Sequence, residues 1–137
     1  VIVPPDGFTN PLTARSVASS LVLTTGHDLH GDVLPDWARL AIGGATVAIY
    51  MGRTVAADVA ARLWNAGLPQ ETPVAVVENA SRRDARLFYG TLKDLPDLAS
   101  MDDITGPAMV IIGEAVAGAD ISRAEPLAQH LRIVATA

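Results

Sequence analysis

The stretch ATVAIYMGRTVAADVAARLWNAGLPQETPVAVVE, residues 45–78, decides the fold class of this chain. Its two ends, residues 45–51 and 73–78, are continuous apolar runs of strand length, which is typical of strands that are covered on both faces. Between them, in residues 53–67, apolar side chains recur at helical spacing, and a glycine and a proline end the pattern. The stretch therefore predicts a strand–helix–strand unit, with parallel pairing of its two strands and a right-handed crossover.

Apolar runs on both sides of this unit extend the pattern to a full domain. Further strands are expected at residues 19–25, 86–92 and 108–116, and further helices at residues 36–42 and 95–104. A short helix, weakened by Pro126, is also expected in the tail. Together these elements predict an α/β fold in which helices flank a mostly parallel or mixed five-stranded sheet.

The composition sets limits on the class of protein and on its partners. The chain has 137 residues, of which 50% are hydrophobic, so one domain with a sizeable core can form. A net charge of −5 without a basic block argues against nucleic-acid binding. The absence of cysteine excludes disulfides, zinc–thiolate sites and thiol nucleophiles. No apolar run approaches the roughly 20 residues that span a bilayer, and no signal peptide is recognisable, so a cytoplasmic location is expected.

Two segments that follow the strands of the first unit are candidates for ligand binding. In open α/β sheets, ligands bind beyond the carboxyl ends of the strands. Residues 50–52 (YMG) and 78–81 (ENAS) stand at such ends. Gly52 has no side chain, so a ligand can approach the backbone of Met51 closely, and Ala80 is small. If the two strands are neighbours, the segments lie side by side; the alternative is that both are ordinary turns.

Three arginines, Arg82, Arg83 and Arg86, form the densest positive cluster of the chain. Because arginine forks suit carboxylates, the cluster could face an acidic ligand or partner. The alternative is a solvated face of a turn or helix. The sequence contains no glycine-rich phosphate loop and no serine nucleophile elbow, so we assign no catalytic residue.

A polar loop at His27, Asp28, His30 and Asp32 contains residue types that bind metals. The loop has neither cysteine nor the helical spacing of a histidine pair, so a solvated loop is the favoured interpretation and no metal is expected. His27, which follows a strand and a glycine, is instead a candidate for the edge of a binding site.

Several short motifs stand in an order that is specific to one family. They are PLTAR at 11–15, TGH at 25–27, DW at 36–37, YMG at 50–52, PVAVVENAS at 73–81, GTL at 90–92 and PAMVIIGEAV at 107–116. With this series, over roughly residues 11–118, the chain resembles the tetrapyrrole methylase superfamily. Within it, the chain most resembles the uroporphyrinogen-III C-methyltransferases and the methyltransferase part of sirohaem synthase. Members of this family have two α/β domains that hold S-adenosylmethionine in the cleft between them.

The resemblance implies how the chain is organised. Residues 16–137 would be the C-terminal α/β domain, and residues 1–15 would be a linker or the truncated remainder of the N-terminal domain. The first residues open without methionine and read like the end of a strand, so we expect a fragment or a processed chain. The glycine-rich GxGxGD loop of the family's first domain is absent from the sequence.

The resemblance also implies which residues bind the cofactor, S-adenosyl-L-methionine, and its product, S-adenosyl-L-homocysteine. Met51 would contact the cofactor, chiefly through its backbone, and Ala80 would line the same pocket. Tyr50, Gly52 and Asn79 would be the immediate supports of these two residues.

For the function, the resemblance implies C-methylation of uroporphyrinogen III to precorrin-2, in sirohaem and cobalamin biosynthesis, by a homodimer. Arg15 and His27 would lie near the cleft, where the carboxylates of the tetrapyrrole are expected. This chain would supply one half of the cofactor cleft and would be inactive by itself. Ala14 stands where the family usually has a histidine, and Ala85 where a glutamine is common. A non-catalytic module for tetrapyrrole binding or dimerisation is therefore one alternative, and a methylase of another precorrin is a second.

Overall fold

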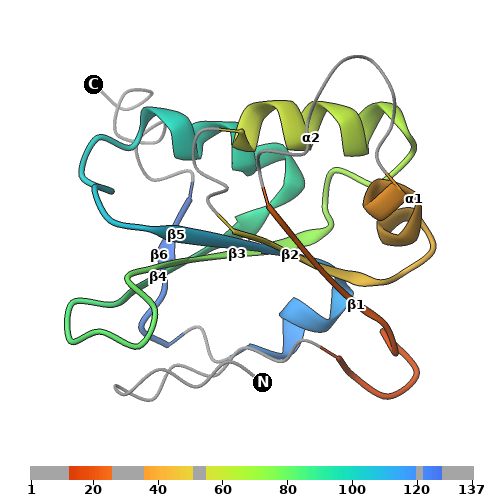
Figure 1. Cartoon of the computed structure of the whole chain (residues 1–137), viewed down its shortest axis with the longest axis horizontal. Helices are drawn as coiled ribbons and strands as arrows, with labels where there is room; N and C mark the ends of the chain where they lie inside the picture. The colour runs from red at the N-terminus through yellow and green to blue at the C-terminus, as the bar shows by residue number, and fades with distance from the viewer. Residues whose placement is uncertain (1–12, 26–35, 51–54, 120–121, 128–137) are drawn as a thin grey trace.

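The computed structural model describes residues 13–25, 36–50, 55–119 and 122–127. Within them, six strands form one mixed sheet in the order β1-β2-β5-β3-β4-β6 (Figure 1). The strands are β1 (Leu21–Thr25), β2 (Thr46–Tyr50), β3 (Pro73–Glu78), β4 (Arg86–Thr91), β5 (Ala108–Ile112) and β6 (Glu125–Pro126). Two pairings, β1 with β2 and β4 with β6, are parallel, and the other three are antiparallel. The predicted α/β class is confirmed, with a sixth strand because the short β6 pairs with β4.

The expected parallel pairing of β2 with β3 is wrong. The two strands run in the same direction, but β5 lies between them and is antiparallel to both. Val110 of β5 has Ile49 of β2 as its partner on one side and Val76 of β3 on the other. All three strands are continuous apolar runs that suit the centre of a sheet, so their composition does not distinguish the two possible orders.

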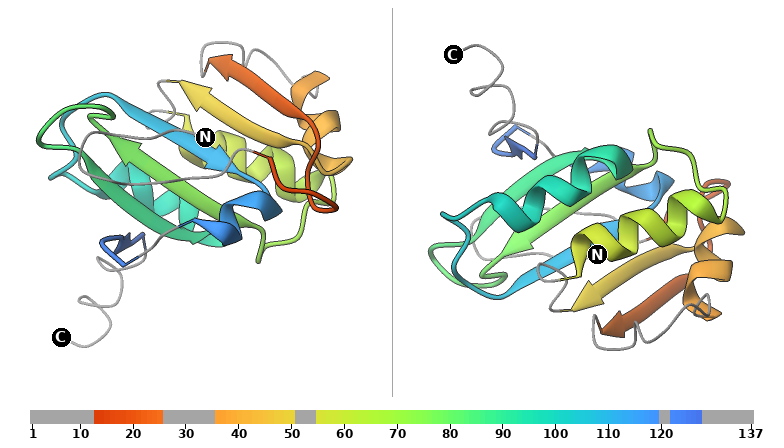
Figure 2. Two further views of the ribbon diagram at one scale, coloured as in Figure 1. Left: turned by 90° about the horizontal axis from the view of Figure 1, so that it is seen from below. Right: turned by 90° about the horizontal axis from the view of Figure 1, so that it is seen from above.

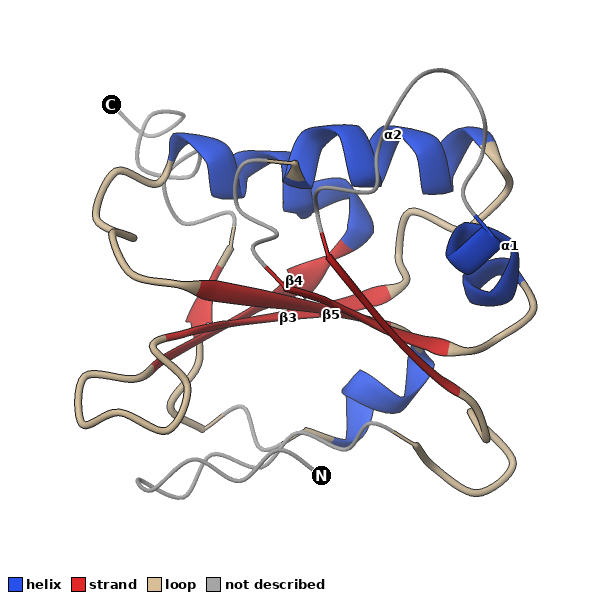
Figure 3. Cartoon of the chain, in the orientation of Figure 1, coloured by secondary structure: helices blue, strands red, loops and turns tan. Residues whose placement is uncertain are grey.

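One face of the sheet is covered by three helices. They are α1 (Asp36–Ile42), α2 (Ala56–Asn65) and the 3₁₀-helix η2 (Leu92–Ser100), all on the upper side of the sheet in Figure 3. Seen from above, α2 and η2 lie next to each other across the strands (Figure 2, right). The apolar stripe of α2, which the helical spacing predicted, packs through Leu63 into a core with Ile49, Val76 and Val110.

The opposite face is covered by a smaller cluster, below the sheet in Figure 3, where the 3₁₀-helix η3 (Glu114–Gly118) lies. Val77, Leu87 and Ile111 pack there with Val116 of η3. At the β1 edge of the same face, Leu23 of β1 is exposed. Among the described residues the two faces are therefore unequal: most of the helical residues cover the first face, and Leu23 at the edge of the second is exposed.

Three expected elements after β3 differ from the sequence interpretation. The helix expected at 95–104 is η2, which starts at Leu92 and contains Pro96, a residue without the amide hydrogen that α-helical bonding needs. The strand expected at 108–116 ends at Ile112, because Gly113 adopts a φ of 148° and η3 follows. In the tail, β6 stands where a helix was considered, and residues 128–137 lie outside the described part.

Candidate functional site

A shallow pocket lies at the carboxyl ends of β2 and β3. Its volume is about 210 Å³, and it is lined by Tyr50, Val77, Asn79, Ala80, Arg82, Pro107, Ala108 and Met109. Met109 of β5 has Tyr50 as its partner on one side and Val77 on the other. The two strand ends are thus not neighbours, as the parallel pairing would require, but they line one pocket across the start of β5. We call this hollow the strand-end pocket.

Three of the residues that the sequence selected for cofactor binding meet in the strand-end pocket. Tyr50 is half exposed at the end of β2, Asn79 is buried, and Ala80 is partly buried. They come from segments that are separated by almost thirty residues in the sequence. Met51 and Gly52, which follow Tyr50, lie outside the described residues. Their expected contacts with the cofactor stay predictions.

The two residues expected near the tetrapyrrole are not in this pocket. Arg15 is exposed in a turn that is closed by the pairing of Ala14 with Ala18, at the amino end of β1. In Figure 1 this turn and the loop after β3 lie on opposite sides of the molecule. His27 lies outside the described residues, as do the other members of the polar loop at 27–32. Among the residues that are described, no group of three or more His, Asp or Glu side chains could hold a metal ion.

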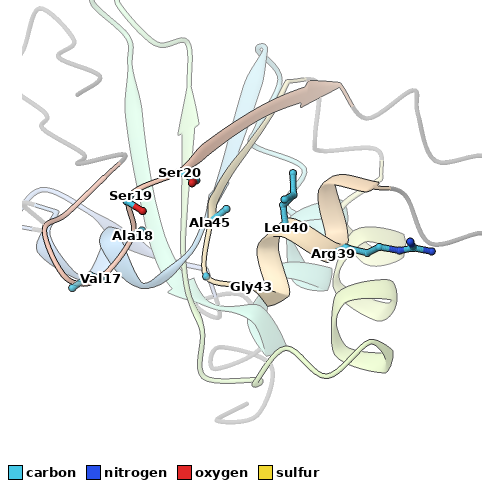
Figure 4. Close-up of a pocket in the computed structure, with 9 residues that line it drawn as sticks. Val17, Ala18, Ser19, Ser20, Arg39, Leu40, Gly43 and Ala45 are labelled. Carbon is cyan, nitrogen blue, oxygen red and sulfur yellow. The ribbon is translucent and has the colours of Figure 1, made fainter.

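A second hollow lies at the amino ends of β1 and β2. Its volume is about 230 Å³, and Ser19, Ser20, Leu40 and Ala45 are among its lining residues. Figure 4 shows the guanidinium of Arg39 extending away from the two serines. None of the residues selected from the sequence lines it, and its walls are mostly backbone and small side chains, so we assign no ligand to it.

The backbone of the loop after β3 is strained at two residues. Asn79 has a φ of 54° and Ser81 a φ of 68°, in the left-handed region that favours glycine. The amide of Arg82 donates to the carbonyl of Asn79 at 3.0 Å, which closes the turn around Ala80. Strained backbone persists where its surroundings over-determine it, and such residues cluster at ligand sites. The turn places Ala80 at the wall of the strand-end pocket.

This strain predicts an unusual stability effect for Ser81→Gly. Glycine adopts a positive φ without a steric penalty, so we expect the variant to be more stable by about 0.5–1 kcal/mol, even though glycine gains entropy in the unfolded state. Urea unfolding measures the difference. Ser81→Ala is the control, because it removes the hydroxyl and keeps the strain. An equal gain in both variants would show that the side chain, and not the backbone, is responsible.

A buried carboxylate connects the two walls of the strand-end pocket. Glu78, the last residue of β3, is 3% exposed. Its Oε2 accepts hydrogen bonds from the backbone amides of Thr105 at 2.8 Å and Gly106 at 2.9 Å. Glu78 precedes Asn79 in one wall, and Gly106 precedes Pro107 in the other. The carboxylate therefore fixes the distance between the segments that enclose the pocket.

Carboxylates from three segments of the chain surround the guanidinium of Arg86. Its Nε and one terminal nitrogen form a fork with the carboxylate of Glu125 at 2.9 and 3.0 Å, and the same terminal nitrogen donates to Asp103 at 2.8 Å. Its other terminal nitrogen lies 3.6 Å from Glu78 Oε1, and the guanidinium stacks on the ring of Phe88. The hydrogen bonds to Glu125 and Asp103 raise the pKa of Arg86 against the opposing effect of burial.

The sequence interpretation missed this network. Glu78 was placed in the candidate ligand-binding segment at residues 78–81, and Arg86 in a positive cluster that could face an acidic ligand or be solvated. One signal was available: a glutamate that closes a continuous apolar run is expected to be buried, and a buried carboxylate needs a partner. The partner itself could not be read locally, because Glu125 lies 39 residues after Arg86.

The side chain of Asn79 is held between the two walls. Its Nδ2 donates to Asp84 at 3.1 Å, while its Oδ1 is buried without a hydrogen-bond partner among the described residues. A Cβ added at Gly106 would overlap this amide, so the close contact requires glycine. The backbone amide of Asn79 also donates a hydrogen bond to the carbonyl of Pro107 at 2.9 Å, which connects the loop after β3 to the segment before β5.

A pocket at the carboxyl ends of strands, with an apolar floor and a few polar groups, stands where α/β domains usually bind small molecules. The family model of the tetrapyrrole (corrin/porphyrin) methylases matches residues 9–96. The chain therefore belongs to this family, and the resemblance seen in its motifs is confirmed. Within the described residues, no helix has the length and apolar character to cross a membrane.

Curated relatives and solved structures give the same assignment. The chain is 43% identical to a siroheme synthase of Gluconacetobacter diazotrophicus over 107 residues and 42% identical to that of Tolumonas auensis over 110 residues. These matches cover 77% and 80% of this chain but 23% of each relative, so the chain spans about a quarter of their length.

Two solved structures are similar over most of the chain. A cobalt precorrin-4 methyltransferase has a TM-score of 0.66 at 29% identity, over 78% of this chain and 45% of that one. A uroporphyrin-III C-methyltransferase of Thermus thermophilus, complexed with S-adenyl homocysteine, has a TM-score of 0.63 at 28% identity, over 79% of this chain and 48% of that one. In both cases the similarity covers less than half of the solved chain.

Proposed function

We propose that this chain forms one side of an S-adenosylmethionine cleft in a methyltransferase that converts uroporphyrinogen III to precorrin-2. Residues 16–137 would be the C-terminal α/β domain, and a cytoplasmic homodimer would be the working form. The siroheme synthase relatives support the pathway, and the solved relative complexed with S-adenyl homocysteine supports the cofactor. The observation that carries the proposal is the convergence of Tyr50, Asn79 and Ala80 in the strand-end pocket.

The residues of the strand-end pocket fit part of such a cofactor. Ligand sites usually enclose ~300–1,000 Å³, so a hollow of about 210 Å³ suits a fragment such as one flat heterocycle. Val77, Ala108 and Met109 supply apolar contact, and the small side chain of Ala80 leaves space above them. The strained turn at Ala80 holds backbone groups at the wall in a fixed direction.

The cofactor and the protein would make different contributions to the methyl transfer. When bound, the cofactor supplies a methyl group activated by its positive sulfur. The residues of this chain would bind the cofactor and orient it toward the tetrapyrrole carbon, and orientation of this kind can be worth roughly 7–11 kcal/mol. No proton transfer is assigned to the strand-end pocket, in keeping with its mostly apolar lining.

Blocking the pocket tests the proposal. We expect the 137-residue chain to bind S-adenosylhomocysteine in calorimetric titration. Ala80→Leu should weaken the affinity more than about tenfold, because the larger side chain occupies the space that Ala80 leaves for the ligand. Ala99→Leu makes the same change at an exposed position of η2 and should leave the affinity unaltered. Equal affinities of the two variants would mean that the ligand binds elsewhere.

A second candidate is methylation of another precorrin. It is supported by the cobalt precorrin-4 methyltransferase, whose backbone matches this chain as well as the uroporphyrin enzyme does. A non-catalytic module is the third candidate, based on Ala14 and on the buried Ala85. Incubating the protein, together with the rest of a siroheme synthase, with uroporphyrinogen III or with later precorrins distinguishes the three by product.

A further inference from the structure

The three arginines of the positive cluster lie in different surroundings. Arg86 is engaged by the carboxylates of Glu125 and Asp103. Arg83 is exposed and does not belong to the lining of the strand-end pocket. Of the three, Arg82 alone lines the pocket. The cluster that the sequence suggested as one patch is therefore divided, and only one of its members faces the candidate site.

The surroundings of Arg82 leave it able to take a ligand. Its side chain is 63% exposed, and its Nε lies 3.6 Å from Oδ1 of Asp84, which is equally exposed. A solvent-exposed pair at this distance contributes little, so it is easily exchanged for a better partner. Asp84 is itself held by Asn79, whose Nδ2 donates to its other oxygen. The weak pair therefore keeps the guanidinium near the rim without saturating it.

The pocket beneath Arg82 is otherwise uncharged. The remaining lining residues are apolar or neutral polar side chains, and none of them carries a formal charge at neutral pH. The chain as a whole has a net charge of −5, so the guanidinium at this rim, with Asp84 as its one weak partner in an ion pair among the described residues, runs against the average of the molecule. A cation at the mouth of an otherwise uncharged pocket favours ligands with an anionic group. An apolar floor with one cation at the rim suits a ligand that has a flat apolar body and a carboxylate.

We propose that Arg82 is a specificity residue of the strand-end pocket and pairs with a carboxylate of the bound ligand. This inference rests on the proposed function, in which two ligands carry carboxylates: the amino-acid end of the cofactor and the acidic side chains of the tetrapyrrole. An arginine fork is the side chain best suited to a carboxylate, because two parallel N–H groups match its two oxygens.

The test compares Arg82→Ala with Arg83→Ala, two changes of the same charge in the same loop. Dissociation constants are measured for S-adenosylhomocysteine, for methylthioadenosine, which lacks the amino-acid end, and for uroporphyrin III. We expect Arg82→Ala to weaken binding of the carboxylate-bearing ligand about tenfold or more, the effect of losing a charge-assisted contact at an exposed rim. Arg83→Ala should stay within about twofold of the wild type, because an exposed charge outside the pocket contributes little.

The affinities for the three ligands distinguish the two possible sources of the carboxylate, the cofactor and the tetrapyrrole. Weaker binding of S-adenosylhomocysteine with unchanged methylthioadenosine assigns Arg82 to the cofactor. Unchanged binding of both nucleosides with weaker binding of uroporphyrin III assigns it to the tetrapyrrole. Arg82→Lys should recover only part of the loss in either case, because lysine keeps the charge but not the fork.

Two other outcomes would overturn the inference about Arg82, and they differ in whether the proposed function fails with it. If wild-type protein binds S-adenosylhomocysteine and both alanine variants bind all three ligands equally well, Arg82 has no such role and the proposed function stands. If the wild-type chain binds none of the three ligands, the proposed function fails and the assignment of Arg82 fails with it. Unchanged thermal unfolding of both variants, expected for exposed side chains, shows that the fold is intact.

Discussion

Replacement of Arg86 by alanine is expected to lower the free energy of unfolding by about 3–5 kcal/mol, because it leaves a buried charge without its partner. Glu78 is 3% exposed. Among the described residues, Arg86 is the cation that forms an ion pair with its carboxylate. The same change releases Glu125 and Asp103, which anchor β6 and the loop before β5. Urea unfolding of the wild type and the variant measures the difference.

A second variant separates the orphaned charge from the loss of the other contacts. In Arg86→Ala/Glu78→Gln the buried group is neutral, and its carbonyl oxygen can still accept from the amides of Thr105 and Gly106. The double variant should therefore be more stable than Arg86→Ala alone. If it is less stable, the cost of Arg86→Ala comes from Glu125 and Asp103, and the buried charge of Glu78 is not its cause.

Gly106→Ala should damage the strand-end pocket more than its small size suggests. The added Cβ would overlap the amide of Asn79, which is buried and held by Asp84. Overpacking of this kind costs about 1–3 kcal/mol. Because Asn79 lines the pocket, the displaced side chain should also weaken binding of S-adenosylhomocysteine. Unfolding in urea and calorimetric titration measure the two effects on one protein.

Two comparisons make the Gly106 result specific. Gly43→Ala adds the same atom where its nearest neighbour, the carbonyl oxygen of Leu40, is 3.4 Å away, so little change is expected. In Gly106→Ala/Asn79→Gly the overlapping amide is absent, and the strained φ of 54° at residue 79 is relieved as well. Stability should return in this double variant. If it does not, the defect arises from the backbone at Gly106 and not from Asn79.

Much of the candidate site could be predicted, because it depends on where strands end. Tyr50, Asn79 and Ala80 were selected because they stand at the ends of two apolar runs and because the family resemblance implied them, and all three line one pocket. The reason that they meet was wrong, since β5 separates the two strands. Arg15 was selected by its motif alone and lies at the other end of the sheet. A motif carries no information on where its segment packs.

The network of Glu78 and Arg86 shows what local patterns cannot reveal. The carboxylate of Glu78 meets amides 27 and 28 residues further along the chain, and the guanidinium meets Glu125 after 39 residues. No periodicity connects such positions. The sequence of this region indicates only that a charged residue at the end of a buried run requires a partner.

By itself, the sequence determined the identity and approximate bounds of β2, α2, β3 and β4, because strand and helix periodicity arise from the backbone geometry of neighbouring residues. It also determined the family, through motifs that stand in one order along the chain. Only the tertiary structure decided that β5 lies between β2 and β3 and that Arg82, but not Arg83 or Arg86, lines the pocket. Those choices depend on hydrogen bonds and packing between residues distant in the chain, where several apolar strands compete for one place in the sheet.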